Sequence, residues 1–509
     1  MGNNSEKNKR IAKNTLFLYF RSILLILISL YTSRVVLEAL GVSDYGIYNV
    51  VGGIVAMFTM LSGSMSSASQ RFITFALGKK DFEHLRKVFN TSLTLHIVLG
   101  LIVIVLLEIL GVWFLYNKLN IPQERLNIAF WVLQFSIATF FIKVISVPFD
   151  SDIVAHEKMS AFAYIGIIDG ILKLFIAIIL SYSSNDRLFF YAFMIFFISF
   201  VTFLIYFIYC RLKFEETRKI KWKIDGGLFH EMFGFAGWNL LGSGSYVLRN
   251  QGIDILLNLF FGVTVNAAKG VCNQIQAGVY QFVTNFQTAV TPQITKSVAQ
   301  NNLTRTHTLI IQGGRFSFYL LTLFTIPIII TTPQILSLWL VEVPQYTIEF
   351  VRWTMIYLLW DSLSRFLINA ILAYGKIRNY ELVVGGTKLL ALPMAYVWLL
   401  LGGSAIVGIW VNIIIEMICI CQRLVFNAKY NGLSWKKYMM EVVVRSWLTF
   451  SFAFLLCYYA QKYVTENFIL IIVISFLISF STIALIGISQ TERNLVVGKV
   501  KAVLKKKIS

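Results

Sequence analysis

The sequence has little charge. Charged residues make up 14% of its 509 residues, against roughly 25% in a typical soluble domain. Hydrophobic residues make up 57%, and a soluble protein of this length could not hide that much apolar surface from water. The composition therefore excludes an ordinary soluble fold and predicts an all-α polytopic membrane protein.

Cysteines are also few. The five are Cys210, Cys272, Cys419, Cys421 and Cys457. All lie in or at the edge of apolar segments, and Cys419 and Cys421 are two positions apart, so on a helix they face different directions. We expect neither a disulfide nor a cysteine-bound metal.

Acidic residues are scarce relative to basic ones, at 25 Asp and Glu against 45 Lys and Arg, which gives a net charge of +20. Nucleic acid is the first partner to consider for such a basic chain. The basic residues cluster beside apolar spans, however, as the positive-inside rule expects of membrane proteins. No soluble module remains between the spans, so we expect no nucleic-acid partner.

Long polar segments are missing too, and the apolar stretches predict fourteen spans in groups of six, six and two. The first group is 15–38, 45–69, 88–115, 126–148, 161–182 and 188–210. The second is 232–260, 264–294, 308–335, 347–374, 381–402 and 404–427, and the last pair is 442–462 and 467–488. The predicted domains are an N-lobe at 1–210, a basic connector at 211–231, a C-lobe at 232–427, the final helix pair at 428–489 and a basic tail at 490–509.

The distribution of Lys and Arg predicts the orientation of these spans. The predicted outer loops hold Lys118, Arg125, Arg187 and Lys462, whereas the inner segments, with the span ends that adjoin them, hold most of the other basic residues, Arg423 among them. Positively charged loops stay on the cytoplasmic side. We therefore expect both termini to be cytoplasmic, with every outer loop short.

The segment 33–77 recurs weakly in the second half of the chain. Phe261-Gly262-Val263-Thr264 corresponds to Leu40-Gly41-Val42-Ser43, and Gly262 follows Gly41 by 221 positions. Identity is thin, but the apolar segments on either side match in order and length. Duplicated halves are common in membrane transporters, so we expect two pseudo-symmetric six-helix lobes plus two C-terminal helices.

Charged residues deep within spans are the candidate functional groups, because a charge at mid-bilayer costs roughly 2.5–3.5 kcal/mol on insertion scales. The cations are Arg21, Arg34, Lys173, Arg249, Arg365 and Lys388. The acids, candidates for ion coupling or pairing, are Asp169, Asp254, Asp361 and Glu416. Other charges lie near span ends, where they can reach the interface, and are interpreted as structural: Glu108, Lys143, Lys269, Arg352 and Arg445.

Two interpretations of the deep charges remain open. Asp169 with Lys173, and Asp361 with Arg365, are spaced i,i+4, so each pair shares a helix face and can neutralise itself. Cations nevertheless outnumber acids within the spans, and they recur in corresponding spans of the two halves. We interpret them as lining a wet central cavity that binds an anionic solute, especially a phosphate.

The first two spans also carry a family resemblance. It rests on Arg34, on the turn Leu40-Gly41-Val42-Ser43-Asp44-Tyr45-Gly46-Ile47-Tyr48, and on Gln70-Arg71-Phe72. Together with the basic N-terminus through Asn14 and the layout of six, six and two, these residues resemble polysaccharide (O-antigen, Wzx-type) flippases of the MATE-like MOP superfamily.

The resemblance implies a function and a place in the cell. It implies a flippase that moves an undecaprenyl-diphosphate-linked oligosaccharide across the bacterial inner membrane by alternating access, with membrane lipids, a polysaccharide polymerase and a chain-length protein as partners. It also implies a lipid-tail groove on the last two helices. No cofactor is expected, and the driving force would come from H⁺, Na⁺ or the membrane potential.

Two other function classes compete with this reading. An ion-coupled multidrug or metabolite antiporter of the same fold would favour acidic cavity residues, and Asp254, Asp361 and Glu416 keep it open. A membrane glycosyltransferase or polymerase is suggested by Asp150-Ser151-Asp152, formally an Asp-x-Asp motif. That motif has no nucleotide-sugar domain around it, so we do not expect an enzyme.

Overall fold

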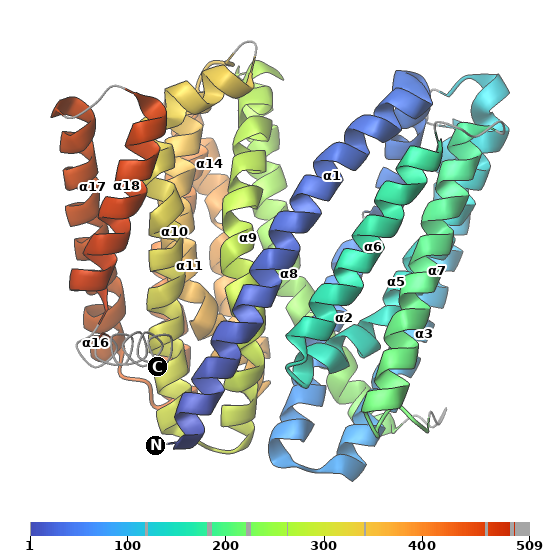
Figure 1. Cartoon of the computed structure of the whole chain (residues 1–509), viewed down its shortest axis with the longest axis horizontal. Coiled ribbons are helices and arrows are strands. Elements are labelled where there is room, and N and C mark those ends of the chain that lie inside the picture. Colours follow the sequence, from blue (N-terminus) through green and yellow to red (C-terminus); the bar gives the residue numbers. More distant parts are fainter. Residues whose placement is uncertain are drawn as a thin grey trace, which may run out of the picture. The chain divides into compact units, whose positions relative to one another are not determined.

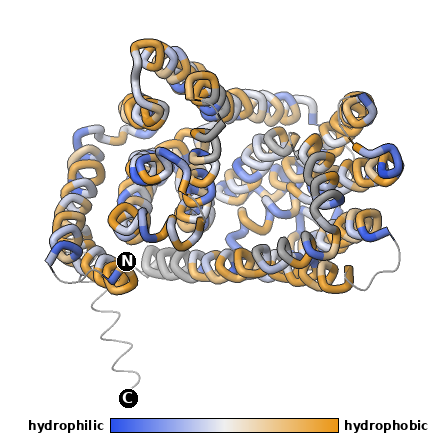
Figure 2. The backbone as a smooth tube through the Cα atoms, turned by 90° about the horizontal axis from the view of Figure 1, so that it is seen from above, coloured by the Kyte–Doolittle hydropathy of each residue, from blue (hydrophilic) through white to orange (hydrophobic). Residues whose placement is uncertain are grey.

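The computed structural model describes residues 2–56, 58–117, 121–180, 186–219, 225–261, 263–340, 343–463, 467–488 and 493. These residues form helices and contain no strand (Figure 1). Ten helices in the described part are long and apolar enough to cross a membrane, and hydrophobic residues run along most of the helices (Figure 2). The chain is therefore a multi-pass membrane protein.

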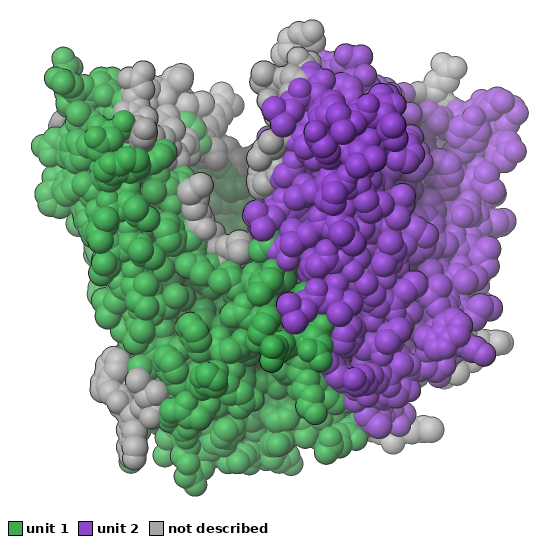
Figure 3. Space-filling view, turned by 180° about the vertical axis from the view of Figure 1, so that it is seen from behind, with its two compact units in different colours: residues 1–244, 288–302, 372–381 green, residues 245–287, 303–371, 382–509 purple. Residues whose placement is uncertain are grey.

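The helices separate into two compact units (Figure 3). Unit 1 contains residues 1–244, 288–302 and 372–381, and unit 2 contains residues 245–287, 303–371 and 382–509. This division follows helix packing, because each unit gathers segments that are distant in sequence. The predicted lobe boundaries around the connector at 211–231 describe chain order instead, and they remain a prediction.

Unit 1 is built mainly from the first half of the chain. In order, its elements are α1 (Gly2–Ala56), α2 (Thr59–Lys79), α3 (Phe82–Leu106), η1 (Leu107–Gly111), α4 (Val112–Asn117), η2 (Gln123–Arg125), α5 (Leu126–Ala155), α6 (Met159–Leu180), α7 (Arg187–Lys213) and the first part of α8 (Gly226–Phe261). Helix α1 packs along α6, and α5 packs along α7. Val51, Leu107 and Val132 are fully buried in the resulting apolar core.

Unit 2 is built mainly from the second half. Its elements are the rest of α8, most of α9 (Val263–Ala299), α10 (Leu303–Trp339), most of α11 (Thr347–Tyr374), most of η3 (Glu381–Gly385), α13 (Gly386–Leu389), α14 (Ala391–Leu400), α15 (Val407–Asn431), α16 (Trp435–Tyr438), η4 (Met439–Val444), α17 (Arg445–Tyr463), α18 (Phe468–Thr482) and η5 (Ile483–Gly487). The ends of α9 and α11, together with α12 (Arg378–Tyr380), belong to unit 1. Helices α17 and α18 pack against each other and against α10.

Within the described residues, each predicted span coincides with a helix or with consecutive helices. The prediction of an all-α fold with about fourteen spans is confirmed. The least regular match is the second span, predicted at 45–69, which is shared between the end of α1 and the start of α2. The turn predicted after Leu40 is a break at Gly41, where φ is 76° and ψ is 166°. Glycine adopts this left-handed region without steric cost, so the break falls there.

Arginine side chains replace hydrogen bonds that the helices lose. Pro333 in α10 has no N–H to donate to the carbonyl of Ile329, four residues earlier, and the helix is kinked at Thr331. Arg352 of α11 donates its Nε to the Ile329 carbonyl at 3.1 Å. Arg445 donates in the same way to the carbonyls of Ile486 and Ile488 at 3.0 and 2.8 Å. The structural interpretation of these two arginines agrees with their contacts.

The end of α11 is held in unit 1 by Arg71. Its Nε donates to the Leu372 carbonyl at 2.9 Å, and its guanidinium lies 4.5 Å from the ring centre of Phe72. Gly375, with φ of +77°, ends this helix, and a Cβ at this position would lie 2.0 Å from an Arg71 nitrogen. A glycine is therefore required at 375 both for its backbone conformation and for the close approach of Arg71.

Candidate functional site

A cavity of about 280 Å³ lies inside unit 1, between α1, α5, α6 and α7. Five charged side chains line it: Arg21, Lys143, Asp150, Asp169 and Lys173. Three of them are basic and two are acidic, so the lining carries one net positive charge when all are ionised. Four hydroxyl groups complete the polar part of the wall, from Ser146, Ser199, Thr202 and Tyr206.

Arg21 reaches this cavity because α6 makes room for it. A Cβ on Gly166 would lie 2.3 Å from Arg21 Nε, so any larger residue at 166 would displace the guanidinium. One helical turn away, the ring of Phe162 lies 4.4 Å from the Arg21 guanidinium carbon, a favourable cation–π geometry. Phe162 and Gly166 together seat the arginine against α6. Across the cavity, Asp150 Oδ1 is buried and accepts no hydrogen bond from the described residues.

Asp169 and Lys173 form the ion pair that their spacing predicts. Lys173 Nζ lies 2.5 Å from Asp169 Oδ2, and Thr202 Oγ1 of α7 donates to the other carboxylate oxygen at 3.2 Å. The side chains are 32% and 25% exposed, so the pair stays in contact with the cavity. Asp169 and Lys173 therefore neutralise each other and also line the cavity, so both interpretations apply to this pair.

A second cavity, of about 440 Å³, lies inside unit 2 between α8, α9, α11 and α15. Its charged lining is balanced, with Lys269 and Arg365 against Asp254 and Asp361. Most of the rest of its polar wall is formed by side-chain amides and tyrosines: Asn250, Asn273, Gln276, Gln281, Asn412, Tyr246, Tyr280 and Tyr357, with Thr284 and Thr354 beside them. This wall offers many neutral donors and acceptors beside aromatic faces.

Asp361 gathers two donors in this second cavity. Arg365 donates Nε and Nη2 to Asp361 Oδ2 at 2.9 and 2.8 Å, and Tyr280 also donates its hydroxyl to that oxygen. The Arg365 guanidinium carbon lies 5.1 Å from the Tyr280 ring centre. The Asp361 carboxylate thus fixes Arg365 in place. The Arg365 side chain is 32% exposed and lines the cavity.

Arg249 is fully buried and does not itself line either cavity. It donates Nη2 to the Tyr357 hydroxyl at 3.0 Å, and its guanidinium carbon lies 5.1 Å from the ring centre of Tyr246. Both tyrosines do line the unit 2 cavity. Arg249 therefore influences this cavity by positioning two of the tyrosine side chains that line it.

Two of the predicted residues lie away from both cavities. Glu416 is buried in an ion pair with Arg423, and Ser364 Oγ donates to Glu416 Oε1 at 2.7 Å. Arg423, which the sequence analysis counts with the inner segments, is 1% exposed and lies inside α15. Lys388 lies on the short helix α13 and lines neither cavity. Arg34 is helical, and its side chain lies outside the described residues.

Sequence reasoning missed two cavity cations, Lys143 and Lys269, because their positions near span ends suggested that they reach the interface. The structure places Lys143 in the unit 1 cavity and Lys269 in the unit 2 cavity. One signal was present: under the 221-residue offset, Lys143 falls within one position of Arg365. Each half of the chain therefore supplies basic groups to a cavity in its own unit.

Comparison with known proteins bears on the fold. A family model described as MatE matches residues 18–179, and no curated protein matches the sequence. A crystal structure of a MATE point mutant aligns with a TM-score of 0.74 at 14% identity, covering 84% of this chain and 97% of that one. The chain has the fold of a MATE transporter.

Two further structures share this MATE fold. One is an outward-facing multidrug resistance MATE family transporter of the MOP superfamily, with a TM-score of 0.72 and 14% identity over 84% of this chain and 97% of that one. The other is a MOP superfamily transporter from Pyrococcus furiosus, with a TM-score of 0.71 and 14% identity over 84% of this chain and 96% of that one. The latter is described by a binding pocket of reverse polarity that suggests a different function.

Proposed function

We propose that the protein is a flippase that moves an undecaprenyl-diphosphate-linked oligosaccharide across the bacterial inner membrane, with both termini in the cytoplasm. The observation that carries the proposal is the basic lining of the unit 1 cavity, where Arg21, Lys143 and Lys173 outnumber the two acids. Arg and Lys are the side chains best suited to bind phosphate oxygens. Such a lining suits a diphosphate and disfavours a cationic drug.

The unit 2 cavity supports the sugar part of the proposal. Sugars present many hydroxyl groups, each both donor and acceptor, on rings with apolar faces. Asn and Gln amides supply both donor and acceptor atoms, and tyrosine rings supply apolar faces with a polar hydroxyl. The combination around Tyr246, Tyr280 and Gln276 therefore fits a neutral or weakly charged glycan better than a single small ion.

The energetics of moving a sugar-diphosphate headgroup across a membrane favour a protein with polar and basic cavities. A sugar-diphosphate headgroup cannot cross hydrocarbon unaided, since its charges and hydroxyls would lose their hydration. Polar cavities inside the protein replace that hydration. Because the cell interior is negative, outward movement of negative charge is favourable by roughly 2.3 kcal/mol per charge for each 100 mV. The membrane potential is thus a sufficient driving force, and H⁺ or Na⁺ coupling is the alternative.

The last two helices suit the lipid tail. The solved MATE structures above cover 84% of this chain, which equals the share that precedes residue 428, so we infer that α17 and α18 are additions to the twelve-helix fold. Their outer surface is strongly apolar, with Leu448, Leu477 and Phe480 each about 60% exposed. A prenyl chain would lie on such a surface while the headgroup crosses. A polymerase and a chain-length protein would act on the exported product.

An ion-coupled multidrug or metabolite antiporter is the second candidate. Asp254 and Asp361 line the unit 2 cavity, and acids in that position suit cationic substrates or coupling ions. One structure with the same fold is a multidrug resistance transporter. Asp361 is already paired with Arg365, however, which leaves Asp254 as the acid best placed for this role.

Reconstitution in vesicles separates the two candidates. The purified protein is placed in liposomes with a fluorescent undecaprenyl-diphosphate oligosaccharide, and exposure of the lipid on the far leaflet is followed with a quencher that does not cross the membrane. We expect flipping above protein-free vesicles. Parallel vesicles report efflux of a cationic dye. Dye efflux without flipping would replace the flippase assignment with the antiporter.

A further inference from the structure

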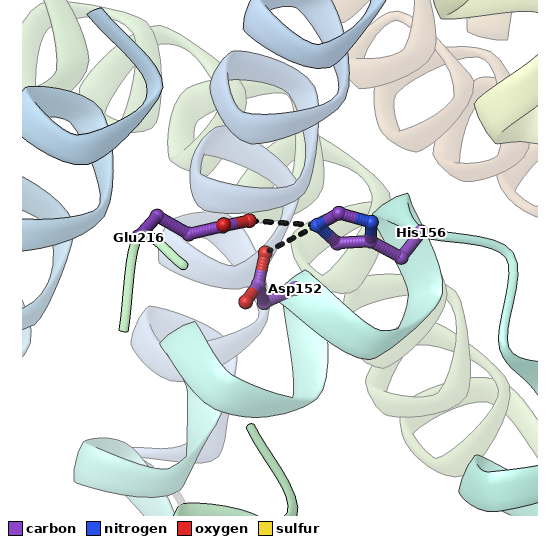
Figure 4. A group of neighbouring side chains, drawn as sticks. All are labelled: Asp152, His156 and Glu216. Carbon is purple, nitrogen blue, oxygen red and sulfur yellow. Dashed lines mark hydrogen bonds and ion pairs between the residues drawn. The ribbon is translucent and has the colours of Figure 1, made fainter. Parts of the chain in front are cut away.

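Three side chains of metal-binding type meet where α7 leads into the connector (Figure 4). Asp152 and His156 come from the end of α5, and Glu216 comes from the turn that follows α7. His156 Nε2 lies 2.7 Å from Glu216 Oε1 and 3.7 Å from Asp152 Oδ1. One ligand atom from each residue lies within 4.8 Å of the others.

The local structure holds these three groups in place. Asp152 and His156 are spaced i,i+4, so they project from the same face of the last helical turn. The ring of Phe214 stacks on the His156 imidazole, with ring centres 4.0 Å apart and planes 8° apart. That contact directs Nε2 toward the two carboxylates. The i,i+4 spacing and the stacked Phe214 ring thus direct one imidazole nitrogen and two carboxylates toward the same point.

The charges at this point do not balance. Asp152 is 0% exposed and Glu216 is 4% exposed. Neither oxygen of Asp152 accepts a hydrogen bond from the described residues, and no described Lys or Arg forms an ion pair with either carboxylate. Burying two carboxylates together is costly unless a cation or a shared proton lies between them.

We propose that Asp152, His156 and Glu216 bind a divalent transition metal of the zinc type. Zinc lies about 2.0–2.2 Å from imidazole nitrogen and carboxylate oxygen, so ligand atoms at the tetrahedral angle lie about 3.4 Å apart. The separation of 3.7 Å between His156 and Asp152 is close to that value. Glu216 needs to move outward by less than 1 Å, from a hydrogen bond to metal coordination.

The donor set distinguishes zinc from the commoner cellular cations. Magnesium and calcium prefer an all-oxygen shell, whereas imidazole with carboxylates suits zinc and its first-row neighbours. The fourth position would be taken by water. The site joins the end of α5 to the segment 214–219, so its effect is to fix the start of the connector between the halves of the chain. The proposal does not depend on what the protein transports.

Zinc titration of the whole 509-residue chain tests this proposal. The protein is purified in detergent with a tag that contains no histidine, treated with a chelator, and titrated with zinc chloride by calorimetry. We expect about one zinc ion per chain and weaker binding of magnesium chloride. Cobalt chloride added to the wild-type protein should give the visible absorption of a tetrahedral or five-coordinate site, a readout that requires no variant.

Variants assign the ion to these residues. Asp152→Asn and Glu216→Gln keep shape and remove charge, and each should weaken zinc binding about tenfold or more. Glu215→Gln is the matched control, because Glu215 is exposed and adjacent to Glu216. All these proteins keep the five cysteines, so adventitious thiol binding stays constant. Zinc should also slow trypsin cleavage after Arg218 and Lys219, which are exposed, in the wild type but not in Glu216→Gln.

Two results would overturn the proposal. One is the absence of saturable zinc binding and of a cobalt spectrum in the wild-type protein, which would assign a shared proton to the two carboxylates. The other is zinc binding by Asp152→Asn and Glu216→Gln with the affinity of Glu215→Gln.

Discussion

Lys296 and Glu157 form an ion pair inside unit 1, with Nζ 2.7 Å from Oε1. Glu157 lies in the turn between α5 and α6, and Lys296 lies in the last turns of α9. Gln293, one helical turn earlier, donates to the other carboxylate oxygen, and Asn14 Nδ2 donates to the Glu157 carbonyl at 3.2 Å. One buried carboxylate therefore holds the end of α9 against helices of the first half.

We expect Glu157→Gln to loosen this attachment. The glutamate side chain is 2% exposed and Lys296 is 23% exposed, so the change leaves a half-buried ammonium without its counter-charge. The cost should be about 1–3 kcal/mol, seen as a lower melting temperature in detergent. Lys296→Met alone should lower it too, while the double variant should lose less than the sum of the single variants. Additive losses would show that the pair is not coupled.

Removing cavity cations should reduce transport. Lys143→Ala and Lys173→Ala each delete a basic group from the unit 1 cavity, and loss of a charge-assisted contact to phosphate should lower the flipping rate about tenfold or more. Lys87→Ala is the control, since Lys87 is 55% exposed and pairs with Glu83 on the surface. Flipping by Lys143→Ala and Lys173→Ala at the Lys87→Ala rate would contradict the assignment.

Arg249 should be needed for the shape of the unit 2 cavity. Arg249→Met removes the partner of the Tyr357 hydroxyl and the cation beside Tyr246. We expect a loss of stability of about 1–3 kcal/mol. Tyr357→Phe removes the hydroxyl alone and should cost less. Thermal unfolding of both purified variants checks this order, and a more stable Arg249→Met protein would refute the role.

The contact between Arg352 and the Ile329 carbonyl offers a test of helix energetics. Arg352→Ala should destabilise the protein by about 1 kcal/mol, because the carbonyl freed by Pro333 loses the shorter of its two side-chain hydrogen bonds and keeps only the one from Thr332 Oγ1 at 3.3 Å. In a Pro333→Ala background, the restored backbone N–H can satisfy the same carbonyl, so Arg352→Ala should cost less there. Equal costs in both backgrounds, measured by thermal unfolding, would show that the arginine does not compensate for the proline.

The accuracy of sequence reasoning differed among the charged residues for a physical reason. The pairs Asp169 with Lys173 and Asp361 with Arg365 were predictable, because i,i+4 spacing alone brings two side chains onto one helix face. The burial of Arg423 was not predictable, because hydropathy does not show that this cation pairs with Glu416 in the same helix. Lys143 and Lys269 were set aside for a similar reason: depth along a helix does not say which neighbour the helix faces.

The sequence by itself determined the class of the protein, the positions of its helices and the local charge pairs, because hydropathy and helical period are properties of short segments. The tertiary structure alone decided which cations share a cavity, that Arg21 is seated against Gly166, that Arg249 supports two tyrosines, and that Asp152 and His156 meet Glu216. These contacts join helices far apart in the chain. They depend on how each helix is rotated against its neighbours, which packing of whole surfaces determines and no short segment encodes.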